Sequence, residues 1–433
     1  MAPPYTKLPH QRHQFRTFID ARIKWVRDPY LDFAVHREKD LQQAVFLKNH
    51  ILSTPSKSLP LSTASLLKAH LHLPTSTYKF SLKYPSIFTQ FHPRPNLPPQ
   101  LKLTQQALAL HKEESAIHSS PIHRKEAVRR LSKLLMLTRA CKLPIYIVDR
   151  LIWDMGLPHN YVLTLLADFP EYFQVCEIKD ELSGEQVLAL ELVSWRDELA
   201  VSELERRVLN CGNSGSKRGR PIAFPMCLPK GFELEKKVWN WFEEWQELPY
   251  ISPYENAFHL SPNSAQAEKW AVAVLHELFW LLVSKKMERD LAFCVGEYLG
   301  FGARFKKALS HYPGIFYVSN KIRTQTVVLR EAYRKDFLVE KHPLMGMRYR
   351  YIHLMNKVPK WRKQAVVMAT GVEQKAALSG ECQWVDRKGG KVNCVIQSYR
   401  STGCGPVDIF GWLAAAAAEL IIGMVPGFRR AGS

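Results

Sequence analysis

Eight cysteines and sixteen histidines are the side chains of this 433-residue chain that could act as nucleophiles or bind a transition metal. A thiol hydrolase needs a cysteine whose thiolate is favoured by a neighbouring histidine, with a third group that orients the histidine. No local nucleophile signature surrounds any of the cysteines. Zinc sites often use C-x-x-C pairs, and no two cysteines have this spacing. We therefore expect no catalytic residue, no metal and no cofactor.

Two further motifs are incomplete. His276-Glu277 lacks the second histidine of a zinc-protease helix, and Gly212, Gly215 and Gly219 lack the Lys-Ser/Thr of a phosphate-binding loop. The chain instead has a large excess of positive charge, since 60 Lys and Arg against 40 Asp and Glu give a formal charge of +20. This excess is larger than solubility requires, and it indicates a polyanionic partner, first of all a nucleic acid. A protein–protein adaptor whose charge only aids solubility is an alternative.

The positive charge gathers in three runs without any Asp or Glu, at residues 206–232, 298–330 and 341–372. Cations bind phosphates by displacing condensed counterions, and aromatic rings among them stack on unpaired bases. Solvated helix faces are the alternative interpretation of each run. With two arginines of a basic helix at 125–142, the residues predicted to contact nucleic acid are Arg129, Arg130, Lys217, Arg218, Arg220, Arg304, Lys306, Lys307, Lys321, Arg323, Arg348, Tyr349, Arg350, Tyr351 and Lys357.

The elements that position these residues are predicted from a motif that occurs three times. An apolar helical stretch, an aromatic residue, a proline and a phenylalanine three residues later recur at Tyr84-Pro85-x-x-Phe88, Phe169-Pro170-x-x-Phe173 and Tyr312-Pro313-x-x-Phe316. Proline has no N–H and restricts the residue before it, so each helix should end at the aromatic residue. Aromatic and β-branched residues follow each proline, and a second apolar run comes after a turn, which predicts a β-hairpin.

Helical segments are also expected after the hairpins, at 105–114, 194–207 and 330–339. A two-stranded hairpin must pack on helices to persist in water. The sequence therefore predicts a mainly α fold with short β-hairpins (α+β), built from tandem winged-helix-like helix–hairpin–helix units. We place these units at about residues 23–114, 121–210 and 221–356, with a linker at 211–220 that is rich in glycine, serine and basic residues.

Five segments carry a family resemblance, in the order Val26-Arg-Asp-Pro-Tyr-Leu-Asp32, Leu163-Thr-Leu-Leu-Ala-Asp-Phe-Pro-Glu-Tyr-Phe173, Leu192-Val-Ser-Trp-Arg196, Leu248-Pro-Tyr-Ile-Ser-Pro-Tyr254 and His342-Pro-Leu-Met-Gly-Met-Arg348. Together they closely resemble the plant organelle RNA recognition (PORR) family, over about residues 22–356. The resemblance implies a nuclear-encoded plant protein that is imported into mitochondria, or alternatively chloroplasts. It also implies binding of organellar transcripts and promotion of group II intron splicing, with other splicing factors as further partners and no catalytic residues.

A DNA-binding winged-helix-like protein is the second interpretation. A reader of duplex DNA needs an element that presents base-reading side chains to the major groove, and nothing in the sequence singles one out. Structured or single-stranded RNA needs distributed cations and exposed aromatic rings, which this sequence contains.

Both ends of the chain lie outside the resemblance. Residues 1–21 have a single acid, Asp20, and carry Lys7, Arg12 and Arg16, which suits a targeting segment. Residues 357–433 are first basic and then rich in glycine and alanine, and we expect a disordered tail, with a buried helix at 410–428 as the alternative. The stretch 410–428 is apolar, but Glu419 and Pro426 argue against a membrane-spanning helix. We therefore expect no stable membrane association.

Overall fold

The computed structural model describes residues 26–66, 68–69, 71, 73–94, 98–211, 220–228, 236–357, 384–385 and 391–392. Residues 1–359 form one compact unit and residues 360–433 a second. In the second unit, β12 (Trp384–Val385) and β13 (Lys391–Val392) pair antiparallel. The predicted targeting segment, most of the predicted linker and the stretch 410–428 lie outside the described residues. Among the described residues, no helix has both the length and the apolar character needed to cross a membrane.

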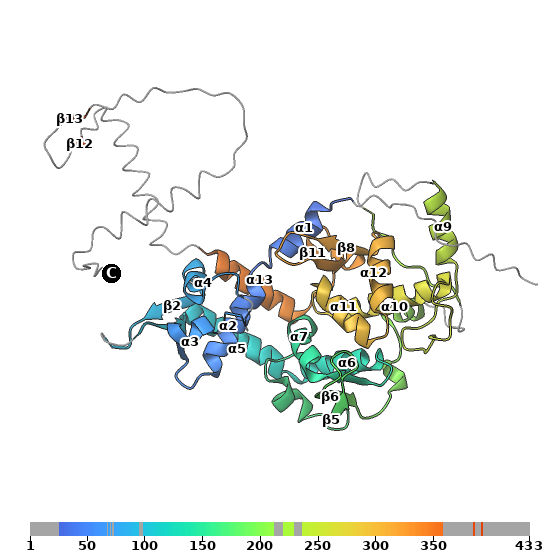
Figure 1. Ribbon diagram of the computed structural model, residues 1–433, viewed down its shortest axis with the longest axis horizontal. Coiled ribbons are helices and arrows are strands. Elements are labelled where there is room, and N and C mark those ends of the chain that lie inside the picture. Colours follow the sequence, from blue (N-terminus) through green and yellow to red (C-terminus); the bar gives the residue numbers. More distant parts are fainter. Residues whose placement is uncertain are drawn as a thin grey trace, which may run out of the picture. The chain divides into compact units, whose positions relative to one another are not determined.

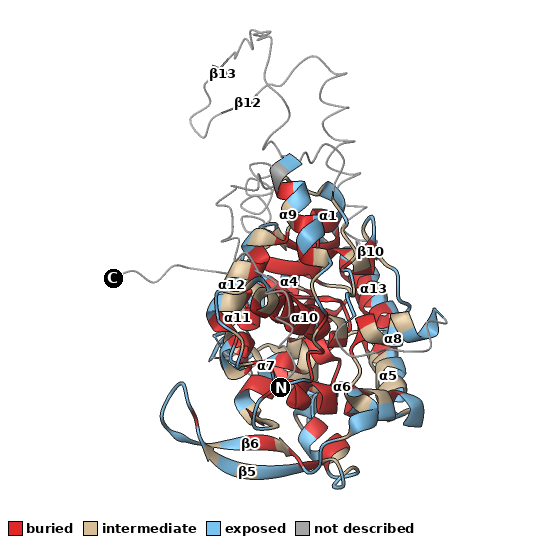
Figure 2. Cartoon of the chain, turned by 90° about the vertical axis from the view of Figure 1, so that its right-hand side faces the viewer, coloured by how far each residue is buried: buried red, intermediate tan, exposed pale blue. Residues whose placement is uncertain are grey.

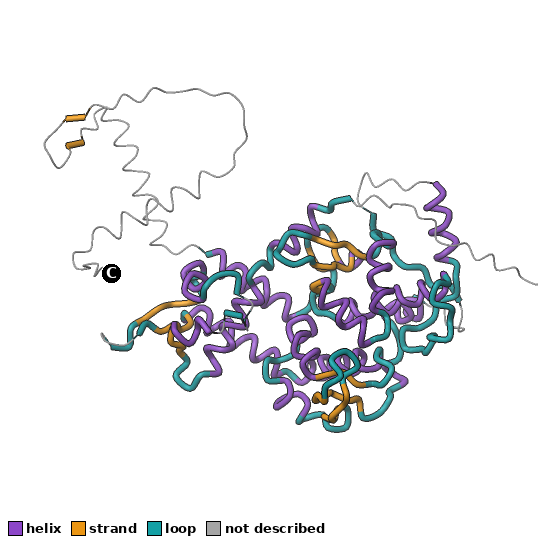
Figure 3. The backbone as a smooth tube through the Cα atoms, in the orientation of Figure 1, coloured by secondary structure: helices purple, strands orange, loops and turns teal. Residues whose placement is uncertain are grey.

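The described part of the first unit contains three three-stranded antiparallel sheets, each preceded and interrupted by helices (Figures 1 and 3). The first group contains α2 (Leu41–Ser53), β1 (Ser58–Pro60), α3 (Leu61–Leu66), α4 (Thr77–Lys83), β2 (Phe88–Phe91) and β3 (Gln100–Leu103). The second contains α6 (Pro121–Met136), β4 (Lys142–Pro144), α7 (Ile145–Met155), the π-helix η1 (Val162–Leu166), β5 (Phe173–Lys179) and β6 (Gln186–Leu192). The third contains α10 (Ala265–Leu281), β7 (Lys286–Glu288), α11 (Arg289–Tyr298), α12 (Gly302–His311), β8 (Phe316–Ser319) and β9 (Thr326–Leu329).

These three groups share one topology. Each runs helix, short strand, helix, helix and hairpin, and the last strand lies in the middle of its sheet, giving the orders β1-β3-β2, β4-β6-β5 and β7-β9-β8. A residue with positive φ directly precedes the short first strand in all three groups, at Lys57, Cys141 and Lys285. Such a conformation is uncommon for residues other than glycine, so its recurrence indicates one repeated backbone path. The α+β prediction is confirmed.

The aromatic-Pro-x-x-Phe motif makes the same turn in each group. The phenylalanine N–H donates to the carbonyl of the aromatic residue four positions earlier, in Phe88 to Tyr84 (3.1 Å), Phe173 to Phe169 (3.3 Å) and Phe316 to Tyr312 (3.0 Å). Tyr84 and Tyr312 end α4 and α12 with nearly equal angles, φ −120° and −119°, because the following proline excludes the helical conformation. Each phenylalanine then begins the hairpin and is buried.

Two of the three helices expected after the hairpins differ in the structure from the prediction. The first is confirmed as α5 (Gln105–Ser119), but 194–207 contains the 3₁₀ turn η2 (Asp197–Leu199) before α8 (Glu203–Asn210) begins at a Ser202 capping box. The prediction of a helix at 330–339 is wrong. There η3 (Arg330–Ala332) leads into a second hairpin, β10 (Tyr333–Arg334) and β11 (Phe337–Leu338), in which the Tyr333 hydroxyl donates to the Ser284 carbonyl at 2.5 Å. This tertiary contact overrides the local helical preference.

The third group contains the most deeply buried helix. Figure 2 shows α10 in red along its visible length, whereas β5 extends outward with mostly exposed residues. α9 (Lys236–Gln246) packs on this group through Trp245, whose ring lies 4.5 Å from the Tyr312 ring between centroids. The aromatic residue that ends α12 is therefore also a core residue.

Both end helices of the first unit pack on distant parts of the chain. The carboxylate of Asp32, in α1 (Pro29–His36), accepts hydrogen bonds from Tyr317 (2.9 Å) and Ser319 (2.7 Å) of β8. α13 (Pro343–Asn356) packs on α5 and α2, where the Tyr351 hydroxyl donates to Glu114 at 2.9 Å. These contacts cross the predicted boundaries 23–114 and 221–356.

Candidate nucleic-acid interface

Two of the predicted contact residues on α13 are buried. Arg348 is 5% exposed, stacks 3.8 Å over the Trp153 ring and donates to the Trp153 carbonyl. Tyr351 is 2% exposed and is bound to Glu114. The expectation that 341–372 is one exposed basic run is thus corrected at these positions, because both side chains hold α13 on the rest of the chain.

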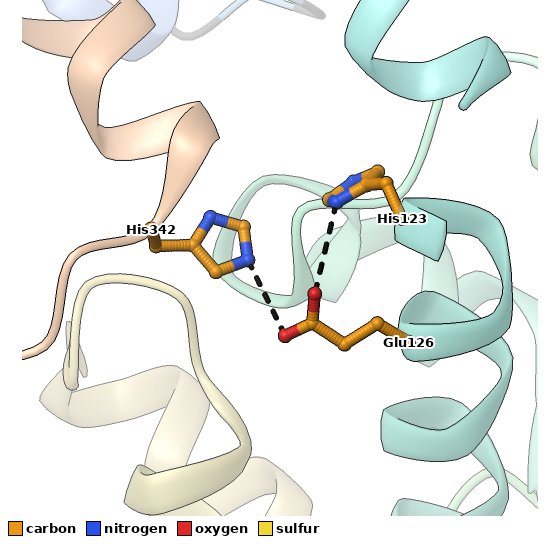
Figure 4. Close-up of side chains that lie close together, drawn as sticks. All are labelled: His123, Glu126 and His342. Atoms are coloured by element: carbon orange, nitrogen blue, oxygen red, sulfur yellow. Dashed lines mark ion pairs between the residues drawn. The ribbon is translucent and has the colours of Figure 1, made fainter. Parts of the chain in front are cut away.

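Arg130 lies in a partly buried cluster that resembles a metal site. His123 and Glu126 of α6 and His342 at the start of α13 point toward one another (Figure 4), and their potential ligand atoms lie within 4.8 Å of one another. Two histidines and a carboxylate are a known zinc-binding set. However, Nη1 of Arg130 lies 2.9 Å from both Glu126 Oε1 and His342 Nε2. The guanidinium already supplies the positive charge between them, so we interpret the cluster as a junction of α6 and α13.

Acid should weaken this junction. Burial, together with the nearby Arg130 charge, lowers the pKa of His342 to about 3. Burial likewise lowers the pKa of the adjacent His118 to about 4. A histidine whose pKa is lower in the folded protein favours folding above its ordinary pKa of 6.5 and loses this contribution as pH falls toward the folded value. We therefore expect the free energy of unfolding, measured by urea titration, to fall from pH 6.5 to pH 4.

The variant His342→Asn tests the assignment. Asparagine is also a good N-cap whose side-chain oxygen can accept the hydrogen bond that the Leu344 N–H donates to His342 Nδ1, but it does not titrate. The pH dependence of its unfolding free energy should be smaller than that of the native protein, whereas the exposed-site control His36→Asn should not change it. Equal pH dependence in all three proteins would contradict the prediction.

The other predicted residues are at the surface or outside the described residues. Lys217 and Arg218 lie in the part of the chain that is not described. Arg129, Arg220 and Lys321 are exposed. Five others contact residues of the same chain. Two form ion pairs, Lys307 with Glu268 (N–O distance 2.8 Å) and Arg350 with Glu113. Arg323 donates a hydrogen bond to the Pro74 carbonyl (3.1 Å), the Lys357 amino group lies 3.5 Å from the Gln106 side-chain oxygen, and the Arg37 guanidinium lies 4.7 Å from the centroid of the Tyr349 ring.

The structure brings Arg304 together with Arg139, which was not predicted. Arg304 lies in the first turn of α12, and its Nη1 is buried without a hydrogen-bond partner in the described structure. Burial, and then the charge of Arg139, lower the pKa of Arg304. The guanidinium of Arg139 stacks 3.5 Å over the Phe258 ring. Among the described residues neither arginine has an ion pair, so an anion that bound here would relieve their mutual repulsion.

Lys306 lies on the same helix, which contains no acidic residue. Its amino group lies 5.5 Å from the Phe293 ring centroid, and Arg304 lies 5.6 Å from the Phe301 ring. We call Arg139, Arg304 and Lys306 the α12 surface. All three cations lie over aromatic rings, as in sites that combine phosphate contacts with stacking.

A sequence signal for Arg139 did exist. Residues 127–148 form a fourth run without Asp or Glu, and this run contains Arg139. The run overlaps the basic helix 125–142, but α6 ends at Met136 and leaves Arg139 in the turn before β4.

Comparisons with known proteins agree with the family resemblance. The family profile described as Plant organelle RNA recognition domain matches residues 26–360. Protein WHAT'S THIS FACTOR 9, mitochondrial, from Arabidopsis thaliana is 35% identical over 345 residues, which are 79% of this chain and 87% of that protein. Protein WHAT'S THIS FACTOR 1, chloroplastic, from Zea mays is 29% identical over 375 residues, covering 85% of this chain and 73% of that protein.

Protein ROOT PRIMORDIUM DEFECTIVE 1 from Arabidopsis thaliana is 28% identical over 368 residues, covering 80% of this chain and 86% of that protein. No solved structure matches the chain. The profile match includes all three helix-and-hairpin groups and both end helices, α1 and α13. The chain belongs to the plant organelle RNA recognition family.

Proposed function

We propose that this protein binds group II intron RNA in a plant organelle and promotes splicing by stabilising the RNA, without catalysing a reaction itself. Membership of an RNA recognition family supports RNA as the ligand. The observation that carries the proposal at the level of residues is the α12 surface, where cations without carboxylate partners in the described structure lie over aromatic rings. The relative with 35% identity is named mitochondrial, so the mitochondrion is the proposed compartment, and the chloroplast is the alternative because the maize relative is named chloroplastic.

The three groups are proposed to be winged-helix-like units. Their shared order of helix, strand, helix, helix and hairpin supports this assignment, as does the central position of the last strand in each sheet. In helix-turn-helix proteins the second helix of the motif contacts the nucleic acid. α12 has the corresponding position in the third group, directly before its hairpin, and it carries Arg304 and Lys306.

The thiols support a non-catalytic role. A nucleophilic cysteine needs a lowered pKa. Burial instead raises the pKa of Cys141, Cys176 and Cys227. These thiols are therefore mostly protonated at neutral pH, which disfavours attack on a carbonyl.

The proposal is tested by binding the purified chain to an organellar intron RNA, single-stranded DNA and duplex DNA over a series of salt concentrations. We expect tight binding that prefers RNA and weakens as salt rises, because phosphate contacts release counterions. Equal affinity for duplex DNA would favour the DNA-binding alternative, which the topology also permits. No salt-dependent binding to any nucleic acid would favour a protein–protein adaptor.

A further inference from the structure

A cavity of about 520 Å³ lies in the described structure, away from the three cations of the α12 surface. It is lined by residues of α2, α5, α7, η1 and α13. Its volume falls within the range of small-molecule sites, about 300–1,000 Å³. Arg348 and Tyr351, which are too buried to lie on an open surface, contribute to its wall.

Flat side chains form part of this wall. The rings of Phe46 and Trp153 meet edge to face, with centroids 6.5 Å apart and an interplanar angle of 88°. The guanidinium of Arg348 stacks on Trp153 at 3.8 Å. Aromatic rings and arginine planes are the groups on which proteins stack unpaired RNA bases.

Two carboxylates line the cavity, Glu114 paired with Lys48 and Asp168 paired with Arg124, and uncharged polar groups lie beside them. His118 has a buried Nδ1 without a hydrogen-bond partner in the described structure, and its lowered pKa keeps the ring neutral at neutral pH. The side-chain amides of Asn49 and Asn160 also line the cavity, and no hydrogen bond is recorded for either among the described residues. Imidazole and amide groups donate and accept hydrogen bonds, as the edges of nucleobases do. The buried Nδ1 of His118 carries a desolvation cost that a bound ligand would remove.

One cation for an attached phosphate lies on α7, the helix that carries Trp153. Arg150 is exposed and precedes Trp153 by three residues on α7, so the two side chains share one helix face. Its recorded contact is a 3.5 Å hydrogen bond to the Cys294 sulfur, and it has no ion pair among the described residues. Arg124 lines the cavity, but its charge is already paired with Asp168, another lining residue, and it also donates to the Thr164 carbonyl at 2.8 Å.

We propose that this cavity takes one unpaired base of the bound RNA, which stacks at Trp153 and Phe46 while His118, Asn49 and Asn160 contact its edge. The inference rests on the proposed function, because it requires RNA on the protein. The α12 surface would then supply affinity for the backbone, and the cavity would supply a preference for a base at one position of the RNA.

The test uses the full chain and a bound intron RNA in which each nucleotide in turn is made abasic. For the native protein, one abasic position should weaken binding by about tenfold, as expected when one stacked base is lost. The variant Asn49→Ala/Asn160→Ala should bind the intact RNA more weakly and should lose most of the abasic penalty at that position. The matched control Asn210→Ala/Asn263→Ala changes exposed residues outside the cavity and should behave as the native protein. Thermal melting checks that both variants are folded. If the cavity double variant does not fold, the single variant Asn160→Ala is measured in its place.

Several outcomes would overturn the assignment. One is a cavity variant that keeps both its affinity and its abasic penalty. Another is the absence of any abasic penalty in a native protein that still binds RNA with strong salt dependence, which would leave the proposed function standing. In a third outcome, a free nucleoside monophosphate raises the melting temperature of the native protein but not that of the cavity variant, and no abasic position weakens RNA binding. The cavity would then bind a free small nucleotide and not a base of the RNA. No RNA binding at all would reject both proposals.

Discussion

The triple variant Arg139→Ala/Arg304→Ala/Lys306→Ala should bind intron RNA with an affinity at least about tenfold lower than that of the native protein. These side chains lie on or beside α12 and have no carboxylate partner in the described structure, so their charge is available to phosphates. Each phosphate contact adds about 0.7 to the slope of log affinity against log salt for single strands, so three lost contacts should reduce the slope by roughly two. Binding titrations at several salt concentrations measure both quantities.

A control variant with the same loss of charge separates local contacts from the overall field. Lys39→Ala/Lys112→Ala/Arg334→Ala removes three exposed cations that lie on other segments than α12 and should reduce affinity only slightly. Both variants should melt close to the native protein. If the two triple variants lose equal affinity, the α12 surface has no special role and the net charge alone attracts RNA.

Phe173→Ala should destabilise the protein by about 3–5 kcal/mol, the usual cost of removing a buried phenylalanine ring. Phe173 is 4% exposed, begins β5 and packs 6.0 Å from the Tyr172 ring between centroids. Domains are usually stable by only about 5–15 kcal/mol, so the second group should unfold at a much lower temperature or denaturant concentration. Urea unfolding measures the change.

Phe337→Ala is the matched control for this ring. Phe337 is 61% exposed in β11, and its replacement should change stability by roughly half a kcal/mol or less. An unchanged unfolding curve for Phe173→Ala would mean that the ring contributes nothing to the core.

The repeated turns were predictable because their cause is local. Proline fixes the end of the helix whatever surrounds it, and the aromatic and β-branched residues that follow favour a strand. The prediction failed at 330–339, where the decisive contact is the bond from Tyr333 to the Ser284 carbonyl, 49 residues away. A periodic pattern does not contain such a partner.

At the candidate site, the main difference between the sequence prediction and the structure is that some of the predicted basic residues are buried. Arg348 belongs to a basic run that we predicted to be exposed, but it donates a hydrogen bond to the carbonyl of Trp153, 195 residues earlier. Arg139 and Arg304 are likewise far apart in the sequence, and only tertiary packing brings the turn after α6 beside the start of α12. Composition predicted a nucleic-acid partner, whereas the selection of individual cations required tertiary contacts that one sequence does not specify.

The pairing of α1 with β8 has a consequence for how the protein is made. Asp32 leaves the ribosome long before Tyr317, which follows 285 residues later, so the third group cannot be completed until nearly the whole described chain is present. Closing so long a loop is entropically costly and slows folding. Until then the buried face of α1, with Leu31 and Val35, lacks its contacts with β8. A chain whose synthesis stopped before β8 would expose this face, and such exposed apolar surface would mark the incomplete product for chaperones and proteases.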